Sequence, residues 1–194
     1  MRNFLGISTA IIVLIVLFPA PGFSTSLKVT WNANPETDLA GYRLYWGTQS
    51  KNYTMSADVL NSTSCNLDEV QGGTTYYIAL SAFDYSGNES ARSSEKSIYV
   101  PYSITLVSPS EGEDCLWSPV LAWSGNGFKS YRVFISITGL VFNQVYSGSS
   151  SYTTIDPILV WMFIPPFATV KWYVEGTTLS GQKILSRKGT FVKR

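Results

Sequence analysis

Apolar and polar residues alternate in short runs along the first half of the chain. This period of two residues is typical of β-strands with one buried face. The runs are separated by turns rich in Gly, Asn, Asp and Ser, such as residues 34–38 and 84–90. The alternating apolar positions are Leu27, Val29, Trp31, Tyr42, Leu44, Trp46, Tyr76, Ile78, Leu80, Ala82, Ile98 and Val100. Short strands at regular spacing, with no amphipathic helix between them, predict an all-β sandwich.

The second half of the chain repeats this pattern less regularly. Leu121 and Trp123 take the place of Val29 and Trp31, and similar alternation follows. The other inward positions predicted here are Tyr131, Val133, Ile135, Val170, Trp172, Val174 and Phe191. Because each half has enough apolar side chains for a core of its own, we predict two tandem β-sandwich modules, residues 25–101 and 103–194.

Trp31 and the group Val70, Gly73 and Tyr76 carry a resemblance to fibronectin type III domains. The segments NPETDLAGYRLYWGT and GTTYYIALSAFDYSGNES resemble the version common in bacterial exported proteins, which suggests a bacterial source. The resemblance implies an immunoglobulin-like β-sandwich. It also implies a tyrosine corner, in which the hydroxyl of Tyr76 bonds to the backbone a few residues upstream.

The resemblance weakens at two places. Few residues precede Trp31 once an export signal is set aside, so we predict that the family's first strand is missing or vestigial. Such an edge can accept a strand from a partner, or can be covered by the neighbouring module or an N-terminal tail. In the second module Val170 replaces the corner tyrosine, so this module resembles either a divergent fibronectin type III domain or a generic immunoglobulin-like sandwich.

The N-terminus has the features of an export signal. Arg2 supplies a positive end, residues 4–18 form an apolar stretch, and Pro19 ends it. We predict a signal peptide over residues 1–24; a retained membrane anchor is the alternative, although the stretch is shorter than the about 20 residues of a span. No second apolar segment of that length follows, so we expect no transmembrane span in the mature chain. The expected location is secreted, periplasmic or on the cell surface.

The composition argues against several classes of function. The 194 residues include no histidine, which is the commonest general base and metal ligand, and only 2 cysteines, too few for a thiolate zinc site. A formal net charge of +1 provides no basic field to attract nucleic acid. We therefore expect a protein that is not an enzyme, with no catalytic residue, cofactor, metal site or nucleic-acid partner.

Two pairs of acidic residues lie on predicted turns, Glu36 with Asp38 and Asp84 with Glu89. Such pairs suggest glycosidase carboxylates or calcium ligands. Glycosidases, however, hold their carboxylates across a cleft, and nothing in the sequence predicts one. Capping of the turns by acidic side chains explains both pairs.

A continuous apolar run at residues 158–167 falls where a surface connection of the second module is expected. Loops are usually polar, and the alternating strands already fill the core. The run should therefore plug one end of the sandwich, pack between the modules, or meet a protein partner or a membrane surface. The candidate partner-binding residues here are Trp161, Met162, Phe163, Ile164 and Phe167.

Three tyrosines of the first module, Tyr45, Tyr77 and Tyr99, are expected to point outward from adjacent strands of one sheet. Such a face can stack on the sugar rings of a polysaccharide or anchor a protein partner. Cross-strand pairing of aromatic rings, which stabilises the sheet itself, is the alternative.

Cys65 and Cys115 lie in different modules, and an oxidising compartment would allow a disulfide between them. The alternation of Cys65 with Leu67 argues instead for an inward thiol that acts as a small core residue. Both possibilities stay open at the level of the sequence.

These features together predict an exported, non-enzymatic binding or scaffolding protein of the cell envelope or extracellular space. Its β-sandwich modules would contact a protein or a polysaccharide. The alternative is an accessory or spacer subunit of an envelope enzyme or surface assembly, with the apolar run docked to the main complex.

Overall fold

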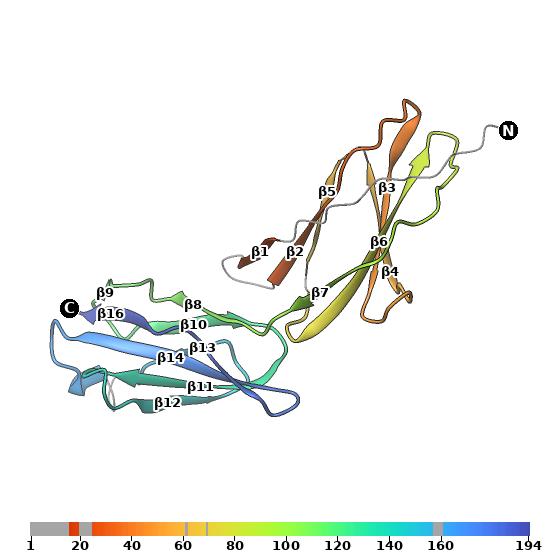
Figure 1. Cartoon of the computed structure of the whole chain (residues 1–194). Coiled ribbons are helices and arrows are strands. Elements are labelled where there is room, and N and C mark those ends of the chain that lie inside the picture. Colours follow the sequence, from red (N-terminus) through yellow and green to blue (C-terminus); the bar gives the residue numbers. More distant parts are fainter. Residues whose placement is uncertain (1–15, 20–24, 61, 69, 157–160) are drawn as a thin grey trace. The chain divides into compact units, whose positions relative to one another are not determined.

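The computed structural model describes residues 16–19, 25–60, 62–68, 70–156 and 161–194 (Figure 1). Within these residues the chain forms β-strands and a short 3-10 helix, as the alternating pattern predicts. The chain divides into two compact units, whose main parts we call module 1 (Ser26–Pro101) and module 2 (Tyr102–Arg194); residues 16–18 group with module 1.

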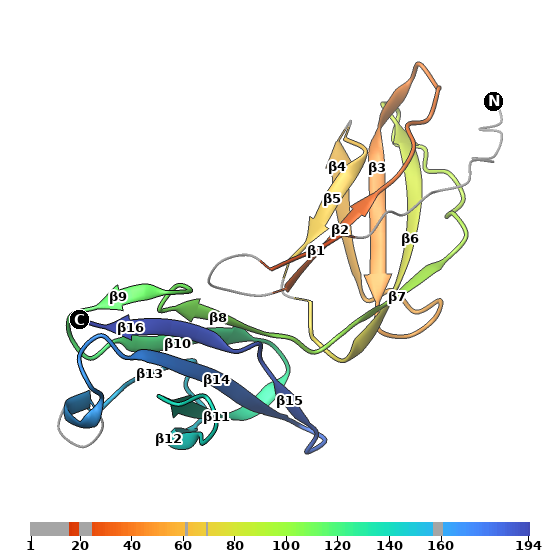
Figure 2. The same ribbon diagram turned by 60° about the vertical axis from the view of Figure 1, so that its left-hand side comes forward.

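Module 1 consists of two sheets packed face to face (Figure 2). One sheet has the order β1 (Val16–Pro19), β2 (Thr25–Thr30), β5 (Ser64–Leu67). The other has the order β4 (Met55–Leu60), β3 (Leu39–Gly47), β6 (Thr74–Asp84), β7 (Lys96–Val100). The predicted inward positions form one core, with Leu27, Val29, Trp31, Tyr42, Leu44, Ile78, Leu80, Ala82 and Val100 buried.

The edge of β2 is covered in the full chain. The first strand was expected to be missing or vestigial once residues 1–24 are set aside, and in the full chain β1 lies beside β2 on the side away from β5. β1 comes from residues 16–19, which belong largely to the apolar stretch of the predicted signal peptide. The chain as a whole therefore supplies the strand, and removal of residues 1–24 would take it away.

The tyrosine corner of module 1 is confirmed. The backbone N–H of Gln71 donates to the Tyr76 hydroxyl at 2.8 Å, five residues upstream as the resemblance implies. Trp31 is buried and meets the ring of Tyr42 edge-on, with ring centroids 5.4 Å apart. Both features stabilise the junction between the sheets.

The segment between β6 and β7 runs back along β6, and serines take part in the pairing. The N–H of Ser93 donates to the Leu80 carbonyl at 2.7 Å, and the Leu80 N–H donates to Ser93 Oγ at 3.1 Å. Ser90 makes the same two bonds with Ala82, at 2.9 and 3.0 Å. Each serine thus satisfies both backbone groups of the residue it faces.

Module 2 also has two sheets (Figures 1 and 2). The smaller has the order β13 (Tyr152–Thr154), β10 (Val120–Gly125), β8 (Ile104–Ser108). The larger has the order β12 (Asn143–Gly148), β11 (Phe128–Ser136), β14 (Thr169–Thr178), β16 (Gly189–Lys193), β9 (Glu113–Cys115), with β15 (Lys183–Leu185) also paired to β14. The 3-10 helix η1 (Trp161–Phe163) lies between β13 and β14.

The core of module 2 confirms the inward positions predicted from the sequence. The buried side chains include Leu121, Trp123, Tyr131, Val133, Ile135, Val170, Trp172, Val174 and Phe191. Trp123 meets Tyr131 edge-on at 5.5 Å, and the Tyr131 hydroxyl donates to the Gly125 carbonyl at 2.9 Å. Ser186 pairs with Val174 through its N–H and Oγ, as Ser90 and Ser93 pair with β6 in module 1.

Candidate functional site

The apolar run at residues 158–167 divides between the core and the surface. Trp161 and Ile164 are buried, and the Trp161 ring stacks on Phe191 with centroids 6.4 Å apart. Met162 and Phe163, on the same turn, are exposed, as is Phe167. Residues 157–160 lie outside the described part of the chain. The run is therefore a plug within module 2 that also presents apolar side chains to the outside.

The C-terminal strand holds this turn in place. The ammonium group of Lys193 donates to the carbonyls of Trp161 and Ile164, at 2.8 and 2.7 Å, and lies 5.0 Å from the centre of the Trp161 ring. The Phe167 N–H donates to the Lys193 carbonyl at 2.6 Å. Phe167 has a φ of 61°, in the left-handed region, which turns the chain sharply into β14.

Two other connections lie at the same end of module 2. β9 runs parallel to β16, with Cys115 opposite Lys193, so Leu116 and Trp117 follow just past the end of β16. β11 ends at Ser136, opposite Lys171 near the start of β14, so the loop from β11 to β12 also projects there. That loop carries the exposed residues Leu140 and Val141.

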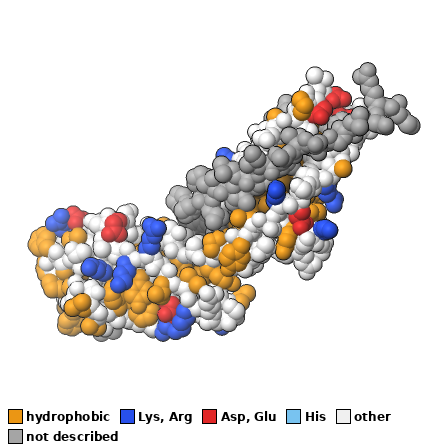
Figure 3. Space-filling model, in the orientation of Figure 1, with side chains coloured by type: hydrophobic (Ala, Val, Ile, Leu, Met, Phe, Trp, Pro, Cys, Tyr) orange, Lys and Arg blue, Asp and Glu red, His pale blue; other side chains and the backbone are white. Residues whose placement is uncertain are grey.

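The three connections place exposed apolar side chains together, and we call this group the apolar end. Its side chains are between 67% and 88% exposed (Val141 and Leu140, respectively). Figure 3 shows hydrophobic side chains gathered at this end of module 2, on the left of the view. The members of the apolar end are Leu116, Trp117, Leu140, Val141, Met162, Phe163 and Phe167.

The apolar end lies opposite the point where the chain joins module 2. Tyr102 packs against Phe128, with ring centroids 5.6 Å apart, and Phe128 pairs with Thr178. Phe128 begins β11 and Thr178 ends β14, whereas the apolar end lies at the other ends of these two strands. The exposed side chains therefore point away from the link to residues before 102.

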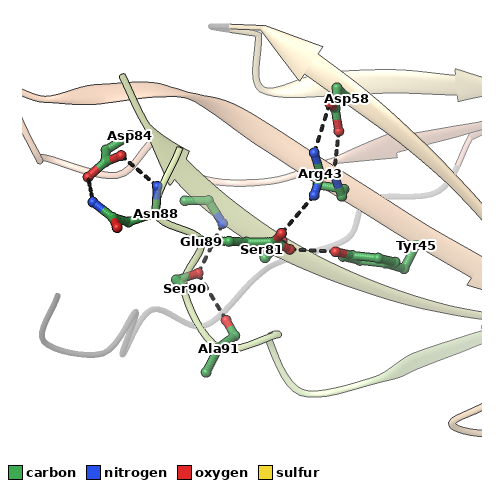
Figure 4. Close-up of polar contacts among 10 residues, drawn as sticks. Arg43, Tyr45, Asp58, Ser81, Asp84, Asn88, Glu89, Ser90 and Ala91 are labelled. Carbon is green, nitrogen blue, oxygen red and sulfur yellow. Dashed lines mark hydrogen bonds and ion pairs between the residues drawn. The ribbon is translucent and has the colours of Figure 1, made fainter. Parts of the chain in front are cut away.

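The outer face of the larger sheet of module 1 is occupied by a polar network around Glu89 (Figure 4). Glu89 accepts hydrogen bonds from the hydroxyls of Tyr45 and Ser81 and from Arg43, which is 2.7 Å away. Arg43 also forms an ion pair with Asp58. Burial alone would raise the pKa of Glu89, but the hydroxyl donors and the charge of Arg43 lower it below the usual range.

Arginine covers part of the predicted tyrosine face. The guanidinium of Arg92 lies 4.1 Å from the centre of the Tyr45 ring and 5.4 Å from that of Tyr53. Tyr77 is half-buried, and Tyr99 is exposed. All three predicted tyrosines are on the outer face, but the ring of Tyr45 already has a stacking partner, which favours a stabilising role for it.

Of the paired acidic residues, Asp84 caps a turn and Glu89 belongs to the polar network. Asp84 accepts hydrogen bonds from the N–H groups of Ser86 and Asn88 at 2.9 and 2.8 Å. A further bond from the Asn88 side chain and these backbone donors lower the pKa of Asp84. Among the described residues, no group of three or more His, Cys, Asp or Glu side chains is placed to hold a metal ion.

Both cysteines are free thiols in the structure, and the disulfide between the modules that the sequence allows stays a prediction. Cys65 is half-buried and its Sγ lies 3.6 Å from the Asn66 carbonyl oxygen. Cys115 is buried in the core of module 2. Burial raises the pKa of both thiols, which makes them poor nucleophiles.

Comparison with known proteins agrees with the geometry of module 1. The family model described as "Fibronectin type III domain" matches residues 21–98. No curated protein matches the chain.

Three solved structures illustrate the similarity. A two-domain fibronectin type III segment of chicken tenascin is 20% identical, with 93% of this chain and 97% of that chain covered and a TM-score of 0.46. The FN1–FN3 domains of chicken CNTN1 are 14% identical over 92% of this chain and 64% of that chain, with a TM-score of 0.35. The Clostridium perfringens spore cortex lytic enzyme SleM is 24% identical over 44% of this chain and 26% of that chain, with a TM-score of 0.32.

The two facing sheets of each module define a protein built of two tandem immunoglobulin-like β-sandwiches. The fibronectin type III family match covers residues 21–98, and the tyrosine corner of module 1 agrees with that match. No helix in the described ranges is long and apolar enough to cross a membrane.

Proposed function

We propose that this chain is an exported, non-enzymatic binding and scaffolding protein whose contact surface is the apolar end of module 2. Fibronectin type III domains are generally non-enzymatic binding or scaffolding modules. The observation that carries the proposal is the gathering of strongly exposed apolar side chains from three connections at one end. Exposed apolar side chains gathered at one end of a protein often mark a site of contact with a partner.

The apolar end is a better candidate than the tyrosine face. Tyr45 is already bonded to Glu89 and stacked under Arg92, so its contacts are made within module 1. Met162 and Phe163, by contrast, are exposed on a turn that is anchored from below by Trp161 and Ile164. A rigid support with outward apolar groups loses little conformational freedom on binding.

The test compares two double variants of the processed chain, residues 25–194. Met162→Ser with Phe163→Ser alters the apolar end, whereas Leu179→Ser with Leu185→Ser removes equally exposed apolar side chains elsewhere in module 2. The readout is the fraction of chain that sediments with an envelope preparation from the source organism. We expect roughly a tenfold weaker association for the first variant, since about 1.4 kcal/mol corresponds to a factor of ten.

The matched variant at Leu179 and Leu185 should sediment like the unaltered chain. Equal sedimentation of the Met162 and Phe163 variant would show that the apolar end is not the contact surface. Both variants change exposed side chains, so both should keep the fold, which circular dichroism checks.

A further inference from the structure

We propose that the apolar end binds the surface of a lipid bilayer and inserts its side chains into the interfacial layer. This inference rests on the proposed function, because it names what the same surface contacts. The arrangement of the side chains, the state of the backbone around them and the charges at their base each support it.

The apolar side chains protrude separately from three connections. Trp117, Leu140 and Phe163 each belong to a different connection, and each is more than three-quarters exposed. A protein partner would need a shaped pocket for each of these groups. A bilayer adapts to separate protruding groups, and aromatic side chains such as those of Trp117 and Phe163 are favoured at its interface.

Several backbone groups of the connections are already hydrogen-bonded within module 2. In the β11–β12 loop, Gly139 N–H donates to Ser136 Oγ at 2.9 Å and Leu140 N–H to Thr138 Oγ1 at 3.2 Å. Around η1, Lys193 bonds the carbonyls of Trp161 and Ile164. Insertion into lipid requires internal hydrogen bonding of this kind, because the hydrocarbon region offers no partner for a free polar group.

Further bonds of this kind lie within the other connections, between them, or between them and the C-terminal residues. They are Arg194 N–H to Cys115 O at 3.0 Å, Phe167 N–H to Lys193 O at 2.6 Å, Ala168 N–H to Pro165 O at 3.2 Å and Ile155 N–H to Pro119 O at 3.4 Å. Protein interfaces instead carry about one hydrogen bond per 100–200 Å² between the partners. Backbone groups that are satisfied internally leave fewer donors and acceptors for such bonds.

Two charged groups at the base of the apolar end, those of Lys193 and Arg194, already have partners. Arg194 forms an ion pair with Asp114 at 2.7 Å, and its guanidinium lies 5.6 Å from the centre of the Phe167 ring. Lys193 is bonded to carbonyls. Contact with lipid therefore leaves neither of these two charges without a partner. We expect binding to depend on insertion of apolar side chains more than on anionic headgroups.

The test uses protein-free vesicles of phosphatidylcholine, with and without phosphatidylglycerol, and the processed chain. Residues 1–24 are left out because the apolar stretch at 4–18 would bind lipid by itself.

Trp117 is 84% exposed, whereas the other tryptophans are buried or half-buried, so brominated lipids should quench the fluorescence of Trp117 selectively. Trp117→Phe should keep binding and lose most of the quenching.

We expect sedimentation with both kinds of vesicle, little weakened by salt, and at least a roughly tenfold loss of partitioning for the Met162→Ser, Phe163→Ser variant. The Leu179→Ser, Leu185→Ser variant should bind as the unaltered chain does. Absence of binding to both kinds of vesicle, or binding that the Met162 and Phe163 substitutions leave unchanged, overturns the lipid proposal.

The outcome is separable from that of the proposed function. If the chain does not bind vesicles but its association with the envelope preparation still depends on Met162 and Phe163, the apolar end binds a protein and only the lipid inference is wrong. If neither association depends on these residues, both proposals fall.

Discussion

At the scale of residues, the hydroxyl group of Tyr76 forms the tyrosine corner of module 1. The Tyr76 hydroxyl accepts the hydrogen bond of the Gln71 N–H across the turn before β6. Tyr76→Phe removes the acceptor and little volume, and we expect it to lower the free energy of unfolding of module 1 by about 1 kcal/mol. Urea denaturation followed by circular dichroism measures this difference.

Tyr77→Phe is the matched control for this change. Tyr77 is the next residue on the same strand, is half-buried like Tyr76, and points to the outer face of the sheet. Its replacement should change stability by less than about 0.5 kcal/mol. A comparable loss in both variants would mean that the corner bond contributes nothing particular.

At the scale of elements, the side chains of Ser90 and Ser93 accept backbone hydrogen bonds from β6 that a neighbouring strand would otherwise accept. Ser93 Oγ accepts the hydrogen bond of the Leu80 N–H, which belongs to the buried middle of β6. Ser93→Ala leaves that donor without its partner, so we expect a destabilisation of about 1–3 kcal/mol. Ser94→Ala, at the exposed neighbouring position, should be close to neutral in the same urea experiment.

Hydrogen exchange gives an independent check of the serine pairing. The Leu80 amide should exchange faster in the Ser93→Ala chain, because its bond to Oγ is lost. Unchanged protection at Leu80 would contradict the role assigned to the serine.

The strand β1 would be lost if the predicted signal peptide were removed. β1 lies beside β2, yet its residues fall within the predicted signal peptide. β2 is also paired with β5 and buries Leu27 and Val29 in the core, so it has a second source of stability. A chain that starts at residue 25 has an unpaired edge at β2, which natural sheets usually cover or protect.

At the scale of the whole molecule, the two modules have separate cores and separate sheets. The apolar end belongs entirely to module 2. We therefore expect residues 102–194 alone to bind vesicles as residues 25–194 do, within about twofold, because a domain with its own core can fold alone. Residues 25–101, as the control, should not bind.

Vesicle sedimentation of the two separate modules decides this point. Binding by residues 25–101 that equals that of residues 102–194 would place the contact surface outside the apolar end. The folded state of each piece is checked by its near-ultraviolet circular dichroism, since both contain buried tryptophan.

Much of the candidate site was beyond prediction from the sequence. The run at residues 158–167 stands out because it is continuous, and Met162, Phe163 and Phe167 are exposed as one of the predicted alternatives requires. Trp161 and Ile164 were candidates for partner binding but are buried in the core. Adjacent residues of an irregular turn point in different directions, and no period in the sequence reveals which of them face inward.

The alternation of apolar residues by itself determined the sandwich fold and the inward positions such as Leu44 and Val133, because strand period is a local property. The tyrosine corner was implied by the resemblance that Val70, Gly73 and Tyr76 carry. Only the tertiary structure decided that Trp117, Leu140 and Phe163 lie at one end of module 2. They come from connections far apart in sequence. Only the connection that contains Phe163 has a continuous apolar run, and the other two have too few apolar residues to form a recognisable pattern. The pairing of β9 with β16 and of β11 with β14 brings them together, and that pairing is set by the core as a whole.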